Sequence, residues 1–276
     1  MTKMTLDTSI LEEDFEGWGN EKYEVFNVFR DYLGLEQRAE VTSLLDRLVD
    51  FYVEGYTERR IINDMFISVA EHTPYSSPVH RKLARMVQDF EGNEKRKERS
   101  KTFLRPEDDE FRGQLLEDIA DIRVCPLGAV QSGLDPIECA NFDAFLANLM
   151  QVGFAYDLSR LLRYAMQDAF YQDHAPDLAL EPSKAQEMLD AWVLTAAQWI
   201  HHNSKGAHEI ARRGDDKLQM ADWIEWRQEF QKAANDQKYG EECRKVASQA
   251  ADLMALAEKL VVRKSDIYCE PFVPLT

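Results

Sequence analysis

The chain has 276 residues, 45% hydrophobic and 30% charged, and 33 Lys and Arg residues against 50 Asp and Glu residues give a net charge of −17 at pH 7. A surface this acidic repels polyphosphate backbones and anionic lipids, which argues against nucleic-acid and membrane partners. No stretch approaches the roughly 20 apolar residues of a membrane span, and the first residues lack the apolar stretch of a secretory signal. We therefore expect a cytosolic or nuclear protein and assign it to the cytoplasm.

The sequence favours neither a metal nor a cofactor. Its four cysteines, which form no CxxC pair and no zinc-site spacing, are Cys125, Cys139, Cys243 and Cys269. The segment HEIARR has Arg212 where an HExxH zinc motif needs its second histidine. Neither common nucleotide-binding loop occurs, and no Ser/His/acid set can be placed by spacing. We predict no metal and no cofactor, and the catalytic residues, if there are any, stay unknown.

The periodicity of apolar residues is helical along nearly the whole chain, and no strict alternation lasts long enough for a strand. We predict an all-α protein, a compact bundle of about ten helices with no significant sheet. The predicted helices span residues 9–16, 20–33, 37–54, 57–71, 78–91, 107–122, 136–153, 155–171, 183–203, 218–235 and 240–262. They are assigned to one domain, 1–276, with an N-terminal subregion 1–100 and a Trp-rich C-terminal subregion 106–262.

Three polar segments interrupt this pattern. The first, EGNEKRKERSKTFLRPEDDE at 91–110, has a basic half followed by an acidic half. Such a segment is typical of a solvated linker, although a docking loop would have the same composition. Residues 172–182 and 203–217 are predicted to be shorter loops.

Two acidic strings resemble the metal-binding motifs of terpene cyclases, which are also all-helical. EDDEF at 107–111 lacks the spaced third Asp of the first motif. NDQKYGEE at 235–242 has the phenol of Tyr239 where the second motif needs an aliphatic hydroxyl. Holding magnesium and diphosphate needs a carboxylate cluster at defined spacing. Short acidic strings arise easily in a chain with 50 acidic residues, so we interpret both as coincidence.

The segment AWVLTAAQWIHH at 191–202 places two tryptophans before two histidines. At about 100° per residue, Trp192 and Trp199 fall on the apolar, core-facing arc of a helix. His201 falls nearly opposite this arc and is expected in solvent, in the last turn of the helix. His202 falls on the flank of the arc and is the only one of the two that is placed to line a groove.

A second aromatic face is predicted in LQMADWIEWRQEF at 218–230. Trp223 and Trp226 share this face with Arg227, and a guanidinium is rarely buried without a partner. Arg227 could stack on an indole and pair with a carboxylate as structural glue. Alternatively, it could anchor an anionic ligand inside an aromatic pocket. Tyr164 and Tyr171, on the helix predicted at 155–171, could add to such a pocket.

The C-terminal third resembles a family of fungal helical proteins that carry a domain of unknown function. The resemblance covers roughly residues 140–262 and rests on a Trp-bearing helix, a W-x-x-W-[KR]-x-x-F segment and a closing helix rich in Ala, Met and Glu. The matching positions are Trp192, Trp199, Trp223, Trp226, Arg227, Phe230, Met254 and Glu258. It implies a fungal, intracellular, all-α protein with no agreed activity. Members can lie beside natural-product pathway genes, which would suit a cofactor-independent catalyst.

Three functional hypotheses remain. The first is a protein that binds a small, largely apolar molecule in an aromatic pocket and acts on it as a cyclase or isomerase without a cofactor. Its predicted ligand-binding residues are Tyr164, Trp192, Trp199, His202, Trp223, Trp226 and Arg227. The second is a non-enzymatic interaction module, and the third is a degenerate terpene-cyclase-like protein. A homo-oligomer is compatible with each.

Overall fold

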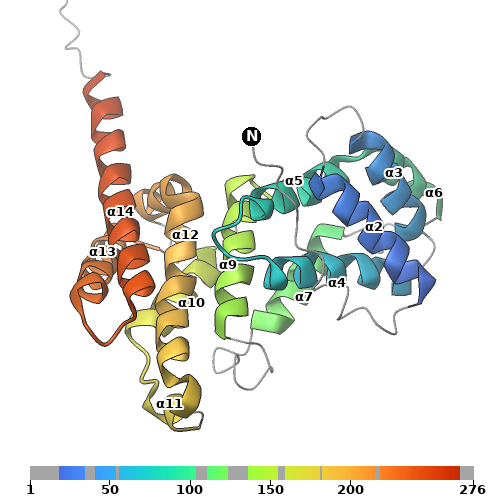
Figure 1. The fold of residues 1–276 in the computed structure, drawn as a ribbon. Coiled ribbons are helices and arrows are strands. Elements are labelled where there is room, and N and C mark those ends of the chain that lie inside the picture. Colours follow the sequence, from blue (N-terminus) through green and yellow to red (C-terminus); the bar gives the residue numbers. More distant parts are fainter. Residues whose placement is uncertain are drawn as a thin grey trace, which may run out of the picture. The chain divides into compact units, whose positions relative to one another are not determined.

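A computed structural model describes residues 19–34, 41–53, 56–103, 111–123, 136–154, 159–180, 182–214 and 218–267 (Figure 1). Helices make up nearly all of this described part, and it contains no β-strand, which confirms the all-α prediction. The backbone forms two compact units, unit 1 (Met1–Tyr156) and unit 2 (Asp157–Thr276). Each is considered by itself, and the assignment of one domain to the whole chain stays a prediction.

Unit 1 is a bundle in which α9 packs against α4 and α5, and α2 packs against α3. Its described helices are α2 (Asn20–Gly34), α3 (Val41–Tyr52), α4 (Tyr56–His72), α5 (Val79–Gly92), α6 (Glu94–Phe103), α7 (Phe111–Arg123) and α9 (Pro136–Gln151). The helix predicted at 9–16 lies outside the described residues.

The core of unit 1 is a cluster of aromatic rings, with Phe111 of α7 in contact with four of them. The ring centroid of Phe111 lies 5.0 Å from that of Phe90 and 5.9 Å from that of Tyr52, both in edge-on arrangements. It also lies 6.3 Å from the centroids of Phe66 and Phe154. These rings come from α3, α4, α5, α7 and the segment after α9, so one cluster ties distant parts of the sequence together.

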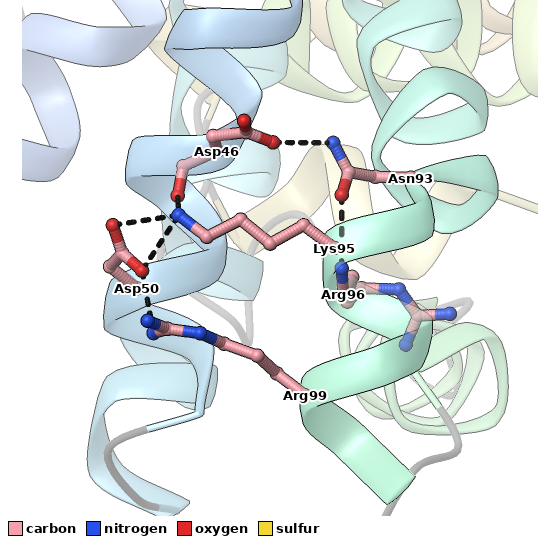
Figure 2. A network of polar contacts seen from close by, with 6 residues as sticks. All are labelled: Asp46, Asp50, Asn93, Lys95, Arg96 and Arg99. Atoms are coloured by element: carbon pink, nitrogen blue, oxygen red, sulfur yellow. Dashed lines mark hydrogen bonds and ion pairs between the residues drawn. The ribbon is translucent and has the colours of Figure 1, made fainter. Parts of the chain in front are cut away.

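Helix α6 occupies part of the 91–110 segment for which a solvated linker was predicted, so that prediction was wrong for residues 94–103. The helix attaches to α3 mainly through charge (Figure 2). Asp50 pairs with Lys95 at 2.9 Å and with Arg99 at 2.6 Å. The Arg96 guanidinium, in contrast, is buried over the rings of Tyr52 and Phe111. A helix held in this way has almost no apolar periodicity, which is why the pattern did not predict it.

Unit 2 is built on α12, which packs against α10 and α14, while α13 packs along α14 (Figure 1). Its described elements are α10 (Ser159–Phe170), α11 (Ala175–Leu180), the short 3₁₀ helix η4 (Pro182–Lys184), α12 (Ala185–Arg213), α13 (Met220–Asn235) and α14 (Glu241–Ile267). The loop predicted at 172–182 therefore contains α11 and part of η4.

Helix α12 continues ten residues beyond its predicted end at 203. Asn203 has non-helical dihedrals (φ −143°, ψ 33°), so the helix kinks there and then resumes. Gly206 leaves room for the Asn203 side chain, which a Cβ at position 206 would displace. The helix ends at Gly214, whose positive φ of 67° suits glycine. The segment NSKGA, typical of a loop, is thus a kink inside a helix.

We expect Phe111→Ala to lower the free energy of unfolding of unit 1 by about 3–5 kcal/mol, because a fully buried ring in contact with four others leaves a cavity. Urea unfolding followed by circular dichroism measures this loss. The control is Tyr23→Ala, at a side chain that is 50% exposed, which should cost less than about 1 kcal/mol. Equal losses in the two variants would mean that the Phe111 cluster is not the centre of the core.

Candidate functional site

Arg227, which the sequence places on an aromatic face, pairs with a carboxylate of the neighbouring helix. Its Nη1 donates to Oε2 of Glu258 at 2.7 Å, and the indole Nε1 of Trp223 donates to Oε1 of the same carboxylate at 3.0 Å. Glu258 therefore joins two residues of α13 to α14. The ion pair supplies the carboxylate partner that the structural-glue interpretation of Arg227 requires, and that carboxylate comes from α14.

Three of the predicted ligand-binding tryptophans are packed in the core of unit 2. Trp199, Trp223 and Trp226 are all buried. The ring of His208, in the resumed part of α12, lies 5.1 Å from that of Trp223 in an edge-on arrangement. His208 is buried, and burial lowers its pKa. These rings mainly hold α12, α13 and α14 together.

Trp192 is the partly exposed member of the set, and it stacks on a histidine from a different segment. Its ring centroid is 3.3 Å from that of His174, with 11° between the planes. His174 lies between α10 and α11, and its Nε2 donates to the main-chain carbonyl of Asp168. The ring of His174 is thereby fixed between Trp192 and the end of α10.

The remaining predicted residues are spread over unit 2. Tyr164 is exposed on α10, with the Arg160 guanidinium 6.0 Å from its ring, and His202 is half-buried on α12. The prediction that His201 faces solvent was wrong. Its Nε2 donates to the carbonyl of Val246 on α14 at 3.3 Å, and burial lowers its pKa. Helix α14 packs against the side of α12 that the helical-wheel projection assigned to solvent.

A pocket of about 380 Å³ opens in unit 2 where α10 ends and α13 ends. We call it the α13 pocket. Its lining residues are Ala169, Phe170, Gln172, His174, Ala175, Leu178, Leu189, Glu229, Lys232, Ala233, Asp236, Lys238 and Tyr239. None of the seven predicted ligand-binding residues is among them, although Trp192 contacts the pocket through His174. Binding by those seven stays a prediction.

The α13 pocket has one mainly apolar wall and one charged wall. The apolar wall consists of Phe170 at the end of α10, Leu178 of α11 and Leu189 near the start of α12. Phe170 packs edge-on against Phe230, with 4.9 Å between the ring centroids. The last turn of α13 and the turn after it supply two ion pairs. Lys232 pairs with Glu229 at 2.6 Å, and Lys238 pairs with Asp236 at 3.6 Å.

The turn that carries Lys238 and Tyr239 is held by α12. Both carboxylate oxygens of Asp190 accept from the backbone N–H of Gly240, at 2.9 and 3.2 Å. Gln186 donates to Asp190 and to the carbonyl of Lys238, each at 3.0 Å. A Cβ at position 240 would lie 2.5 Å from Oδ2 of Asp190, so a side chain there would displace the carboxylate that holds the turn. One wall of the pocket is therefore fixed by backbone contacts.

The sequence carried one usable signal for the pocket. Glu229, Lys232, Ala233 and Asp236 recur at spacings of three and four, so they share one face at the end of α13. That face reads as an ordinary solvated surface because it contains no large apolar residue. The opposite wall comes from α10, α11 and α12, and no spacing rule brings these segments together.

No group of three or more His, Cys, Asp or Glu side chains in the described part of the chain is arranged to hold a metal ion. Of the two strings compared with terpene cyclases, residues 107–110 lie outside the described part. The other, 235–242, forms the end of α13, the turn and the start of α14, and three of its residues line the α13 pocket. Magnesium-dependent diphosphate binding stays an untested hypothesis.

Unit 1 contains a separate group of titratable side chains where α4 ends beside α9. Nε2 of His72 lies 4.0 Å from Oε1 of Glu138. Burial raises the pKa of Glu71 to about 7, the charge of Glu138 adds to the shift, and His72 opposes it. Asn141 connects the two segments, since it donates to the Glu71 carbonyl and accepts from the N–H of Tyr75, both at 2.7 Å.

We expect the stability of unit 1 to fall as pH rises from about 4.5 to 7, because the folded chain holds the Glu71 proton more tightly than the unfolded chain does. Glu71→Gln mimics the protonated form of the side chain. Its free energy of unfolding should therefore exceed that of wild type only slightly at pH 5, and by on the order of 1–3 kcal/mol at pH 8. Urea unfolding at the two pH values measures the difference. Glu117→Gln, at an exposed site of α7, is the control, and a pH-independent gain for Glu71→Gln would contradict the assignment.

We expect Glu258→Ala to destabilise unit 2 by about 1–3 kcal/mol, because the guanidinium of Arg227 and the indole N–H of Trp223 lose their acceptor together. The matched control on the same helix is Glu242→Ala. Glu242 is 63% exposed and lies 3.7 Å from Lys245, so its loss should stay within about 0.5 kcal/mol. Chemical denaturation of both variants provides the comparison, and equal losses would show that the Glu258 contacts contribute little.

None of the described helices is both long enough and apolar enough to cross a membrane. No curated protein and no solved structure matches the chain. A family model described as "Protein of unknown function (DUF3632)" matches residues 64–251, which is more than half of the chain. All lining residues of the α13 pocket lie within the matched segment, as does Arg227, whereas Glu258 lies beyond it. The chain therefore belongs to the DUF3632 family, a family of unknown function.

Proposed function

We propose that unit 2 binds a small organic molecule with an apolar body in the α13 pocket. The observation that carries the proposal is the pocket itself, whose volume of about 380 Å³ falls within the roughly 300–1,000 Å³ of small-molecule sites. Apolar side chains on one wall and a few charged groups on the other are the usual composition of such sites. The first supply contact area, and the second orient the bound molecule.

Aromatic rings support the proposal, although they are not the tryptophans singled out by the sequence. Phe170, His174 and Tyr239 line the pocket, and Trp192 lies directly behind His174. A planar molecule could pack against these rings with a geometry that aromatic pairs favour. Trp192 would then report on occupancy through its fluorescence, because it is stacked on a pocket residue.

A second candidate, a non-enzymatic interaction module, is favoured by a different observation. Trp199, Trp223 and Trp226 are packed in the core, and Arg227 pairs with Glu258. These residues thus serve the fold, and the family resemblance they carry fits a scaffold as well as a binding protein. The two candidates differ in one property: only the first requires the α13 pocket to take up a ligand.

The setting we propose for this binding is the cytoplasm of a fungal cell and a role in small-molecule biosynthesis. The proposal includes cofactor-independent catalysis of the cyclase or isomerase type, carried out by shape and hydrogen bonding. The net charge of −17 supports the exclusion of nucleic acid and anionic membrane as partners. A homo-oligomer is part of the proposal and is tested by the mass of the native protein in solution.

We expect the neutral naphthalene fluorophore prodan to bind unit 2 of the full chain and to shift its emission to the blue. Ala169→Phe should reduce the affinity at least about tenfold, because a ring at this lining position fills the pocket. Fluorescence titration measures both affinities. Ala221→Phe, at an exposed position of α13 that does not line the pocket, should bind as wild type. Prodan affinity that Ala169→Phe leaves unchanged would favour the interaction module.

A further inference from the structure

The α13 pocket contains an ammonium group held in the way that proteins hold organic cations. Nζ of Lys238 lies 4.8 Å from the centre of the Tyr239 ring, and the Asp236 carboxylate is 3.6 Å from the same nitrogen. A ring face and a carboxylate are the two partners that recognise an organic ammonium. The wall of the pocket therefore already has the chemistry for a cation.

The second ion pair of the pocket is unequal in its exposure. Glu229 is 21% exposed, whereas its partner Lys232 is 70% exposed. A lysine so open to water gains little from its ion pair, so another cation can take its place at low cost. The carboxylate of Glu229 is the more sheltered group of the pair, and it lines the pocket.

The surroundings of the pocket are acidic beyond these two pairs. Tyr171 adjoins the lining residues Phe170 and Gln172, and its hydroxyl pairs with Glu225. Burial raises the pKa of Tyr171, and the negative charges of Glu225, Glu229 and Asp222 raise it further. The two lining lysines are matched by the carboxylates of Glu229 and Asp236, and Glu225 and Asp222 add further negative charge beside Tyr171. The chain as a whole carries −17, which acts in the same direction.

From these observations we infer that the ligand of the α13 pocket is an organic amine, bound as its ammonium ion, with an aromatic or other apolar body. The inference rests on the proposed function, since it names the class of molecule for the same pocket. The apolar body packs against Phe170 and Leu178, and the ammonium replaces Lys232 at Glu229. The acidic surroundings draw a cation toward the pocket and keep anions away.

Three probes with the same ring system test the inference by calorimetry on the full chain: 2-(2-naphthyl)ethylamine, 2-(2-naphthyl)ethanol and 3-(2-naphthyl)propanoate. They are a cation, a neutral molecule and an anion at pH 7. We expect the amine to bind at least about fivefold more tightly than the alcohol and the propanoate to bind most weakly. Added salt should reduce the advantage of the amine.

Two reciprocal variants locate the effect. Glu229→Gln should abolish the advantage of the amine over the alcohol, because it removes the sheltered carboxylate. Lys232→Gln should increase that advantage, because it removes the competing cation. Asp252→Asn, an exposed change of the same kind on α14 away from the pocket lining, should leave the ratio as in wild type.

The outcomes separate the two proposals. If the alcohol binds and the amine binds no better, or if the propanoate binds most tightly, the amine inference is overturned while small-molecule binding stands. If all three probes fail to bind, the α13 pocket takes up neither class and both proposals fall. An amine advantage that Glu229→Gln leaves intact would also overturn the inference, since the cation would then be held elsewhere.

Discussion

Unit 2 depends on a carboxylate of α12 that reaches the turn between α13 and α14. Asp190 accepts from the N–H of Gly240, immediately before α14 begins at Glu241. A carboxylate at a helix start satisfies a free backbone donor and interacts favourably with the helix dipole. The same contact holds the turn that carries Lys238 and Tyr239, two lining residues of the α13 pocket. One wall of the pocket therefore relies on the contact between this turn and α12.

The aromatic residues of unit 2 divide into two groups with different roles. Trp199, Trp223 and Trp226 are shielded from water and link three long helices. Trp192, near the other end of α12, is only half-buried and stacks on His174. The kink at Asn203 separates the part of α12 that supports the pocket from the part that carries His208 against Trp223. One helix thus serves both the core and the candidate site.

Much of the helical architecture follows from the sequence, and the exceptions have physical reasons. Helix α5 was predictable because Leu83, Val87 and Phe90 recur at helical spacing, and the structure buries all three. Helix α6 was not, because ion pairs rather than apolar burial attach it to α3. The wheel placed Arg227 correctly on the face of Trp223, but its partner Glu258 is 31 residues away and no spacing rule identifies it. The α13 pocket could not be predicted from the sequence for the same reason, since the segments that form its walls meet only in the folded chain.

The way α6 is attached has a consequence for local opening of unit 1. Ion pairs between partly exposed side chains weaken as the ionic strength rises, whereas burial of apolar rings does not. Concentrated salt should therefore weaken the ion pairs of Asp50 with Lys95 and Arg99, while the Phe111 cluster and the buried Arg96 guanidinium over it stay in place. Amide hydrogens in α6 would exchange with solvent before those of α4 and α5. Helix α6 and the Phe111 cluster are thus expected to open separately, with α6 opening at the lower free energy.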